Sequence, residues 1–412
     1  MCLLFRVQFI LREVLFKQLP DRSILKSSLN LSLGVFTLSR LVVNTASRMI
    51  YPFLAIFAHG LKVEIGVISL AMAVSMATGA LGPFLAPIAD RRGRKTGMLI
   101  GMGIFMAGML AASFFPNLAT FFIAIILGTL GNNVLLPPIQ AYLGDHTPYE
   151  KRGFYMAVIE LSWALSFVLM VPLAGMILER TLWNGPFIAL AIAGAVSTLL
   201  IWWLVPNDPP APGEPVAVFA DIRKVLAYAP AVVAMLMGMS FIIGNELVNV
   251  VFGVWMQDAY GLQIAALGAA SAVIGLSELS GEGVAAFLAD RIGKERAIAA
   301  GIVLSSLIAI SLPLLGQSQV GAFIWLFIFY FSFEVVIISA LPLMTEVVPT
   351  ARATMMALFI AALSLGRAFG DLLAPWLYQG GIFINALGCL VFNLIALFLL
   401  TRIRLPKNQP AS

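Results

Sequence analysis

Twelve apolar stretches, each long enough to cross a lipid bilayer as a helix, occupy most of this sequence. A bilayer core about 30 Å thick is crossed by roughly 20 apolar residues in helical conformation, and a helix satisfies its own backbone hydrogen bonds within the lipid. We therefore predict an all-α membrane protein with twelve transmembrane helices. The predicted spans are residues 31–57, 63–87, 97–115, 118–144, 153–178, 185–205, 228–255, 263–287, 297–315, 321–344, 354–377 and 382–402.

Composition excludes a water-soluble enzyme. Hydrophobic residues make up 61% of the 412 residues and charged residues 11%, whereas globular proteins average about 45–50% and about 25%. Cys2 and Cys389 fit no disulfide or zinc spacing, and His59 and His146 fall in predicted loops. The sequence shows no Walker lysine loop and no Gly-x-Ser-x-Gly turn. We expect no catalytic residue, no metal and no cofactor.

The formal net charge of +5 is better explained by membrane topology than by a nucleic-acid partner. Lys and Arg concentrate in alternate breaks between the spans, and the opposite breaks carry only Lys62 and Arg180. Short loops rich in Lys and Arg remain on the cytoplasmic side of a membrane. We predict a multi-pass protein of the inner (cell) membrane with both termini in the cytoplasm.

A proline-rich run and a repeated motif divide the chain into two halves. Proline recurs through residues 206–215, which cannot sustain a helix. The motif Ala89–Lys95 recurs as Ala289–Glu295, 200 residues later, after the second span of each half. The predicted domains are a cytoplasmic amphipathic segment 1–28, a six-helix bundle 29–205, a cytoplasmic linker 206–227, a second six-helix bundle 228–402 and a cytoplasmic tail 403–412.

The motif from Gly82 to Lys95 (GPFLAPIADRRGRK) resembles the loop 2–3 signature of the major facilitator superfamily, and Gly283–Lys294 is a weaker second copy. This resemblance implies two pseudo-symmetric six-helix bundles around a central cavity that opens alternately to each side. The segment Trp183–Phe187, together with Asp145, Pro148 and Arg152, is similar to the drug/proton antiporter branch. Two features depart from that branch: Ala124 stands where its members carry an arginine, and span 5 retains only Pro172 and Gly175 of a glycine-rich run.

The repeated motif also has a physical interpretation as a gate. Asp90 lies at the end of a span, where it can accept hydrogen bonds from a helix start or pair with Arg94, and Gly82 permits close helix packing. We expect the motif to latch the halves in the outward-facing state; alternatively, its basic residues only anchor the topology. The gating candidates are Gly82, Asp90, Arg91, Gly93, Arg94, Asp290, Arg291 and Gly293.

Ionisable residues within the spans are the strongest functional signal, because each costs at least about 2.5–3.5 kcal/mol at the centre of a membrane helix unless it is paired or hydrated. Arg48 and Glu246 lie at similar depth in repeat-related spans, so we predict that they pair across the cavity; alternatively, each reaches the outer surface separately. Glu334 lies near the middle of span 10, where desolvation favours the protonated carboxyl group, although it could instead bond a neighbouring helix.

Two further pairs of charged residues lie four positions apart on one helix face. Arg367 and Asp371 are expected to neutralise one another, and Glu278 and Glu282 are expected to belong to the gate. Glu246, Glu334 and Asp371 are the candidates for proton coupling.

Uncharged polar residues predict the lining of the cavity. Pro137 and Pro138 should bend or break span 4 beside several of them, and irregular backbone at this depth is tolerated within protein or against water. Abundant Phe and Met side chains suit a loosely specified amphipathic ligand, but they suit lipid contact equally. With Arg48, the cavity candidates are Asn44, Asn132, Asn133, Gln140, Asn245 and Asn249.

These observations predict a secondary active transporter that works by alternating access. We expect it to export a lipophilic or amphipathic small molecule in exchange for protons, acting as a monomer among membrane lipids. One alternative is a proton-coupled importer of a polar solute such as a sugar or an organic anion. Another is a non-transporting sensor or lipid-handling protein of the same fold.

Overall fold

The computed structural model describes residues 22–81, 93–207 and 218–403, and within these residues the chain forms helices and no strands. Predictions for segment 1–21, for Gly82, Asp90 and Arg91, and for the tail beyond residue 403 fall outside the described residues. The helices of the N-terminal half are α2 (Arg22–Arg48), α3 (Leu54–Leu61), α4 (Ile65–Gly79), α6 (Arg94–Phe114), α7 (Leu118–His146), α8 (Tyr149–Leu165), the π-helix η1 (Ser166–Met170), α9 (Val171–Arg180) and α10 (Gly185–Leu204).

The C-terminal half begins with a helix inside the predicted linker. This helix, α11, forms because the prolines end at Pro215 and leave an amphipathic segment, whose Val225 is buried. The helices of this half are α11 (Val218–Ala227), α12 (Ala229–Asn249), α13 (Phe252–Tyr260), α14 (Ile264–Ile292), α15 (Lys294–Leu315), α16 (Gln319–Val347), α17 (Arg352–Tyr378) and α18 (Ile382–Leu400).

The helices confirm the predicted all-α membrane fold. By length and composition, 10 helices of the described chain could cross a membrane, or 11 if the bent pair α3 and α4 counts as one span. The predicted first span runs through α2 and α3 and lies partly outside that count, because polar residues dilute the apolar run of α2. Two spans are interrupted: η1 joins α8 to α9, and residues 250–251 separate α12 from α13.

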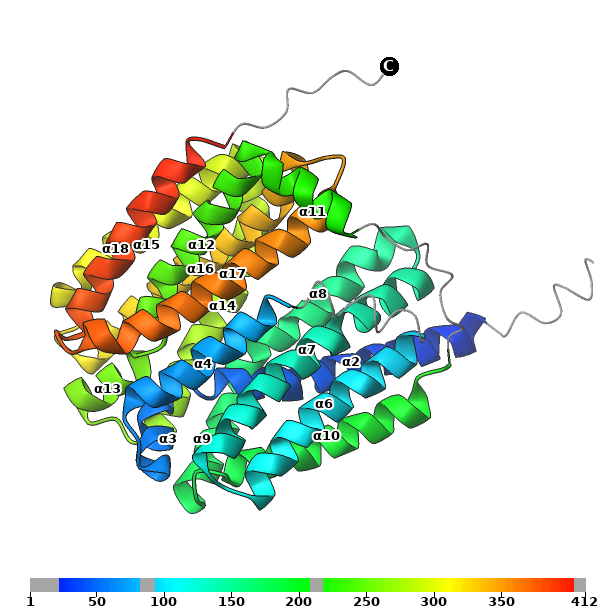
Figure 1. Ribbon diagram of the computed structural model, residues 1–412, viewed down its shortest axis with the longest axis horizontal. Coiled ribbons are helices and arrows are strands. Elements are labelled where there is room, and N and C mark those ends of the chain that lie inside the picture. Colours follow the sequence, from blue (N-terminus) through cyan, green and yellow to red (C-terminus); the bar gives the residue numbers. More distant parts are fainter. Residues whose placement is uncertain (1–21, 82–92, 208–217, 404–412) are drawn as a thin grey trace, which may run out of the picture.

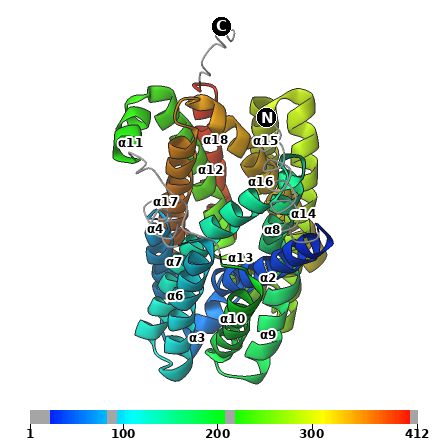
Figure 2. The same ribbon diagram turned by 90° about the vertical axis from the view of Figure 1, so that its right-hand side faces the viewer.

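The two halves form two helix bundles that lie side by side (Figure 1). Between them, α4 packs against α17, and α14 packs against α8, η1 and α9. We call the end of the molecule that carries α11 and the C-terminal end of α18 the terminal end, and the end that carries α3 and α13 the far end. Figure 2 views the bundles after a quarter turn, with α13 lying behind α2 and α17.

Local geometry repeats between the halves at the terminal end. Gly93 precedes α6 with φ 92°, and Gly293 precedes α15 with φ 88°, a backbone region that side chains disfavour. One residue later, Arg94 pairs with Asp145 at 3.5 Å, and Lys294 pairs with Glu346. The internal sequence repeat therefore corresponds to a repeated structure.

Helix α7 shows that one prediction about the backbone is wrong. It runs unbroken through Pro137 and Pro138 from Leu118 to His146. Close packing explains its continuity, because Gly101 of α6 and Gly131 of α7 bring the two backbones so near that a Cβ atom has no room at either position.

Candidate functional site

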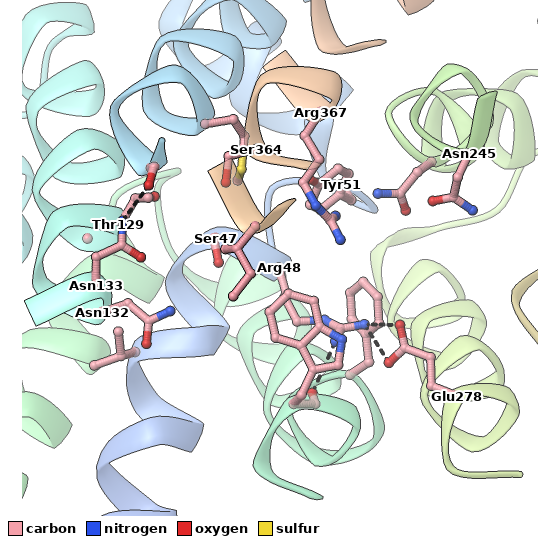
Figure 3. Close-up of a pocket in the computed structure, with 18 of the residues that line it drawn as sticks. Ser47, Arg48, Tyr51, Thr129, Asn132, Asn133, Asn245, Glu278, Ser364 and Arg367 are labelled. Carbon is pink, nitrogen blue, oxygen red and sulfur yellow. Dashed lines mark hydrogen bonds and ion pairs between the residues drawn. The ribbon is translucent and has the colours of Figure 1, made fainter. Parts of the chain in front are cut away.

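A cavity of about 250 Å³ lies between the two halves (Figure 3). Its walls come from α2, α4, α7, α8 and η1 of the N-terminal half and from α12, α14, α16 and α17 of the C-terminal half. The volume falls near the lower limit of small-molecule sites, which span about 300–1,000 Å³. The apolar and aromatic part of the wall consists of Val43, Met76, Trp163, Phe167, Phe333 and Ile360.

Dense packing closes the far end beyond this cavity. Every residue in 49–54 and 247–256, where α2 and α12 end, is buried. Gly253 lies against the backbone of Pro52, where a Cβ atom would not fit. Glu179 of α9 accepts a hydrogen bond from the backbone N–H of Ala265 at 2.9 Å, joining the halves at this end. A ligand therefore cannot reach the cavity from the far end in this conformation.

An ion pair inside the cavity connects the two halves. Arg48 Nη2, at the end of α2, donates to Glu278 Oε1 at 2.6 Å and Oε2 at 2.7 Å, on the middle of α14. The side chains of both residues are 3% exposed, so water screens the pair weakly. Hydrogen bonds between charged groups are the strong ones, and this pair is the charged contact through which the halves meet at the cavity.

The rest of the Arg48 guanidinium is held by its own half. Nη1 donates to the carbonyl oxygen of Trp163 at 3.2 Å. The guanidinium carbon lies 4.2 Å from the Trp163 ring centroid and 3.6 Å from that of Phe167, which places it in cation–π contact with both rings (Figure 3). Arg48 therefore has a binding place in the N-terminal half that does not depend on Glu278.

A second ion pair lies wholly within the C-terminal half. Arg367 Nη1 on α17 donates to Glu246 Oε1 on α12 at 2.7 Å. Asn249 Nδ2 donates to the other Glu246 oxygen at 2.9 Å, and Tyr330 Oη donates to Asn249 at 2.5 Å. This chain fixes Glu246, which is fully buried, and turns Arg367 toward the cavity.

The predicted pairing of Arg48 with Glu246 is therefore wrong. Position along a helix, which sequence provides, sets depth but not which neighbour a side chain meets. Gly275 on α14 lies against Ala164 and Val168, and the absence of its Cβ lets α14 come close to α8 and η1. That approach brings Glu278 to Arg48, so Glu278 lines the cavity and does not belong to a gate at the helix end.

The predicted neutralisation of Arg367 by Asp371 is also wrong. Gly370 allows the side chain of Glu246 to pack directly on α17, so Glu246 takes the guanidinium group. The carboxylate oxygens of Asp371 are buried and have no hydrogen-bond partner in the described structure. Its backbone carbonyl oxygen accepts a hydrogen bond from Ser69 of α4, which crosses between the halves.

Glu334 lies on α16 and is 5% exposed. Its Cβ and Cγ pack against Gly281 of α14, between Glu278 and Glu282 along that helix. In the part of the chain that is described, Glu334 forms no ion pair. Glu282 is partly exposed. The assignment of proton coupling to Glu246, Glu334 and Asp371 remains a prediction.

The amide candidates fall into two groups. Asn132, Asn133, Asn245 and Asn249 line the cavity with Arg48. Asn44 and Gln140 are not among its lining residues. Asn44 donates to Ser162 at 3.4 Å, and Gln140 donates to Glu160 at 3.4 Å, because both face α8.

Sequence reasoning missed several residues of the wall, above all Tyr51, Trp163 and Phe167. The spacing of Trp163 and Phe167, four residues apart in one span, was the available signal for a shared face.

The gating motif is only partly described. Arg94 pairs with Asp145 within its own half, and the guanidinium of Arg291 lies 4.2 Å from the Phe287 ring centroid. The side chain of Asp290 is outside the described residues. The latch between the halves therefore stays a prediction.

Comparison with known protein families finds one match that spans the two bundles. The Major Facilitator Superfamily model matches residues 36–370 and residues 234–412. The uncharacterized MFS-type transporter YceJ of Bacillus subtilis is 25% identical over 349 residues, covering 82% of this chain and 87% of that protein. YwfA of the same organism, also described as an uncharacterized MFS-type transporter, is 29% identical over 161 residues, covering 39% of this chain and 38% of that protein.

Solved structures share the fold at lower identity. A bacterial homolog of the human lysosomal transporter Spinster, in an inward-facing and unoccupied conformation, superposes with a TM-score of 0.71 at 14% identity, covering 93% of this chain and 96% of that one. A mutant of the peptide transporter POT in complex with sulfate gives a TM-score of 0.73 at 16% identity, covering 90% of this chain and 94% of that one. These similarities concern the arrangement of helices.

Proposed function

The chain belongs to the major facilitator superfamily and is a secondary transporter, and we propose that it exchanges protons for a lipophilic or amphipathic small molecule. The ion pair between Arg48 and Glu278 is the observation that carries this proposal. It lies in the cavity and joins the two halves, which must move against one another in alternating access.

Protonation of Glu278 is the step that opens this pair. A neutral carboxyl group loses its charge-assisted hydrogen bonds to Arg48, each worth about 1.5–3 kcal/mol. Arg48 then keeps its contacts with Trp163 and Phe167 in the N-terminal half, so the released cation is not left without partners. The proton thereby removes a contact between the halves at a low cost to either half.

The cavity wall suits a substrate with an apolar body and a polar group. Met76, Phe333 and Ile360 offer apolar surface, while Asn132 and Asn245 offer hydrogen bonds. A polar substrate group that takes the place of Arg48 on Glu278 competes with the proton for the same carboxylate. Competition for one site makes proton and substrate bind alternately, which is the requirement for exchange.

Orientation and assembly complete the proposal. The basic residues of the terminal-end loops place that end, and both chain termini, in the cytoplasm of a cell whose inner membrane holds the protein. Since the far end is closed, the conformation described above is then inward-facing. The cavity is built by one chain, and we propose that a monomer transports.

Reconstitution in liposomes tests the exchange. With an imposed pH gradient, the wild type should accumulate lipophilic or amphipathic dyes against their concentration gradient. Glu278→Gln should lose this accumulation but retain exchange of labelled for unlabelled dye at equal pH. Glu346→Gln, which removes a carboxylate from the exposed end of α16, is the matched control and should behave as the wild type. Unchanged accumulation in Glu278→Gln contradicts the proposal.

A second candidate function is proton-coupled import of an organic anion. It is favoured by the two guanidinium groups that line the cavity, Arg48 from one half and Arg367 from the other. An anion that binds Arg48 while a proton binds Glu278 moves together with that proton. Uptake of organic anions driven by protons flowing in the same direction supports this candidate against exchange. Lipid movement between leaflets without added substrate supports the lipid-handling alternative.

A further inference from the structure

Three carboxyl groups stand in a row along the contact between α14 and α16. Glu278 and Glu282 are four residues apart on α14, a rise of about 6 Å along the helix. Glu334 of α16 packs its stem against Gly281, so it enters the row between the other two. A residue with a side chain at position 281 would displace Glu334 from this place.

Exposure decreases along the row toward the cavity. Glu282, one turn nearer the terminal end, is partly exposed. Glu334 is 5% exposed, and the Glu278 side chain is 3% exposed. In the described structure Glu278 alone of the three has a cationic partner. A buried carboxylate without a partner is costly in a protein interior, whereas the protonated form of the group is tolerated there.

The surroundings of Glu334 leave it free to exchange a proton. The charged groups within electrostatic reach of it are Glu278 and Glu282 on α14, Arg48 on α2 and Arg367 on α17. Both arginines are already engaged, Arg48 with Glu278 and Arg367 with Glu246. Among the described residues, no cation therefore holds Glu334 in its charged form, and its nearest charged neighbours along α14 are two further carboxyl groups.

We infer that Glu282 and Glu334 form the path by which a proton from the terminal end reaches the ion pair of Arg48 and Glu278. This inference rests on the proposed function, because it supplies the proton on which the exchange depends. Glu282 takes the proton from water and passes it to Glu334, which passes it to an oxygen of Glu278. An O–H bond forms on Glu278 as its ion pair with Arg48 opens, and both donors return to the state from which they began.

Trp163 provides a reporter for this step, because its ring stacks on the Arg48 guanidinium. In purified wild-type protein without substrate, a rapid drop in pH should change the tryptophan fluorescence as Arg48 moves, and Trp163→Phe should remove that component. Glu278→Gln should abolish the pH-dependent component. Glu334→Gln should leave its final amplitude unchanged but slow its rate at least tenfold, and Glu334→Asp, which retains a carboxyl group, should restore much of the rate. Glu346→Gln, on the same helix but in a surface ion pair, should react at the wild-type rate.

The outcomes separate this inference from the proposal on which it rests. A wild-type rate in Glu334→Gln, with the component absent in Glu278→Gln, overturns the path and keeps Glu278 as the proton site. A full pH-dependent component in Glu278→Gln overturns the proton site itself. Slowing in both Glu334→Gln and Glu334→Asp assigns the effect to packing against Gly281 and also overturns the path.

Discussion

Arg48 has two sets of partners that belong to different halves of the molecule. Trp163 and Phe167 hold its guanidinium by stacking, and the carboxylate of Glu278 binds it from across the cavity. A guanidinium is planar and binds both ring faces and carboxylates with defined geometry, which the ammonium group of lysine cannot reproduce. The chemistry of this position therefore depends on arginine and on more than its positive charge.

Arg48→Lys should reduce gradient-driven transport by roughly tenfold or more, since tenfold corresponds to about 1.4 kcal/mol, less than one charge-assisted hydrogen bond contributes. Accumulation in liposomes measures the effect. Arg40→Lys is the control on the same helix, because Arg40 meets Glu160 through one long contact of 3.4 Å within its own half. Equal activity of the two variants would show that charge alone matters at position 48.

At the same scale, sequence could identify the ionisable residues of the spans but not their partners. Arg48, Glu246 and Glu334 are all buried, as their cost in lipid requires. The pairing depends on which helix faces are in contact, and that is decided by Gly275 and Gly370, whose effect on neighbouring helices a single sequence does not reveal.

Helix α14 is the element on which the site depends most, because it contacts the other half along α8, η1 and α9 and also carries Glu278. Its glycines have different environments. A Cβ atom at Gly275 would lie 2.7 Å from the side chain of Val168 and 2.8 Å from the carbonyl oxygen of Ala164, whereas a Cβ atom at Gly283 would meet nothing within 4 Å.

Gly275→Ala should therefore force α14 away from α8 and η1 and destabilise the protein by about 1–3 kcal/mol, the usual cost of overpacking. Gly283→Ala, on the same helix, should change stability by less than about 1 kcal/mol. Thermal unfolding in detergent, followed by circular dichroism, measures both. A melting temperature for Gly275→Ala equal to that of Gly283→Ala would contradict the close contact.

Element boundaries were predictable where apolar runs met charged or proline-containing breaks, and most predicted spans coincide with helices. Interruptions within spans were less predictable. The π-helix η1 precedes Pro172, whose missing N–H disturbs the preceding turn, yet α7 continues through two prolines because α6 packs closely against it. Tertiary contact decides which proline interrupts a helix.

For the whole molecule, the two halves touch along two helix pairs and meet through charged groups at the cavity. The pseudo-symmetry expected from the repeat appears in the paired glycines and ion pairs at the starts of α6 and α15. Asymmetry lies in the site itself, because the ion pair of Arg48 with Glu278 joins the halves, whereas that of Arg367 with Glu246 does not. The first pair is therefore placed to control movement between the halves.

The distance between the halves at the far end measures that control directly. Spin labels at Leu182 and Leu314, both highly exposed and in different halves, report it in a background without native cysteines. Acidification should shift the wild type toward longer distances, and Glu278→Gln should show the longer distances at every pH. A distance distribution that ignores pH in the wild type, or that responds to pH equally in Glu278→Gln, would contradict a proton-operated ion pair between the two bundles.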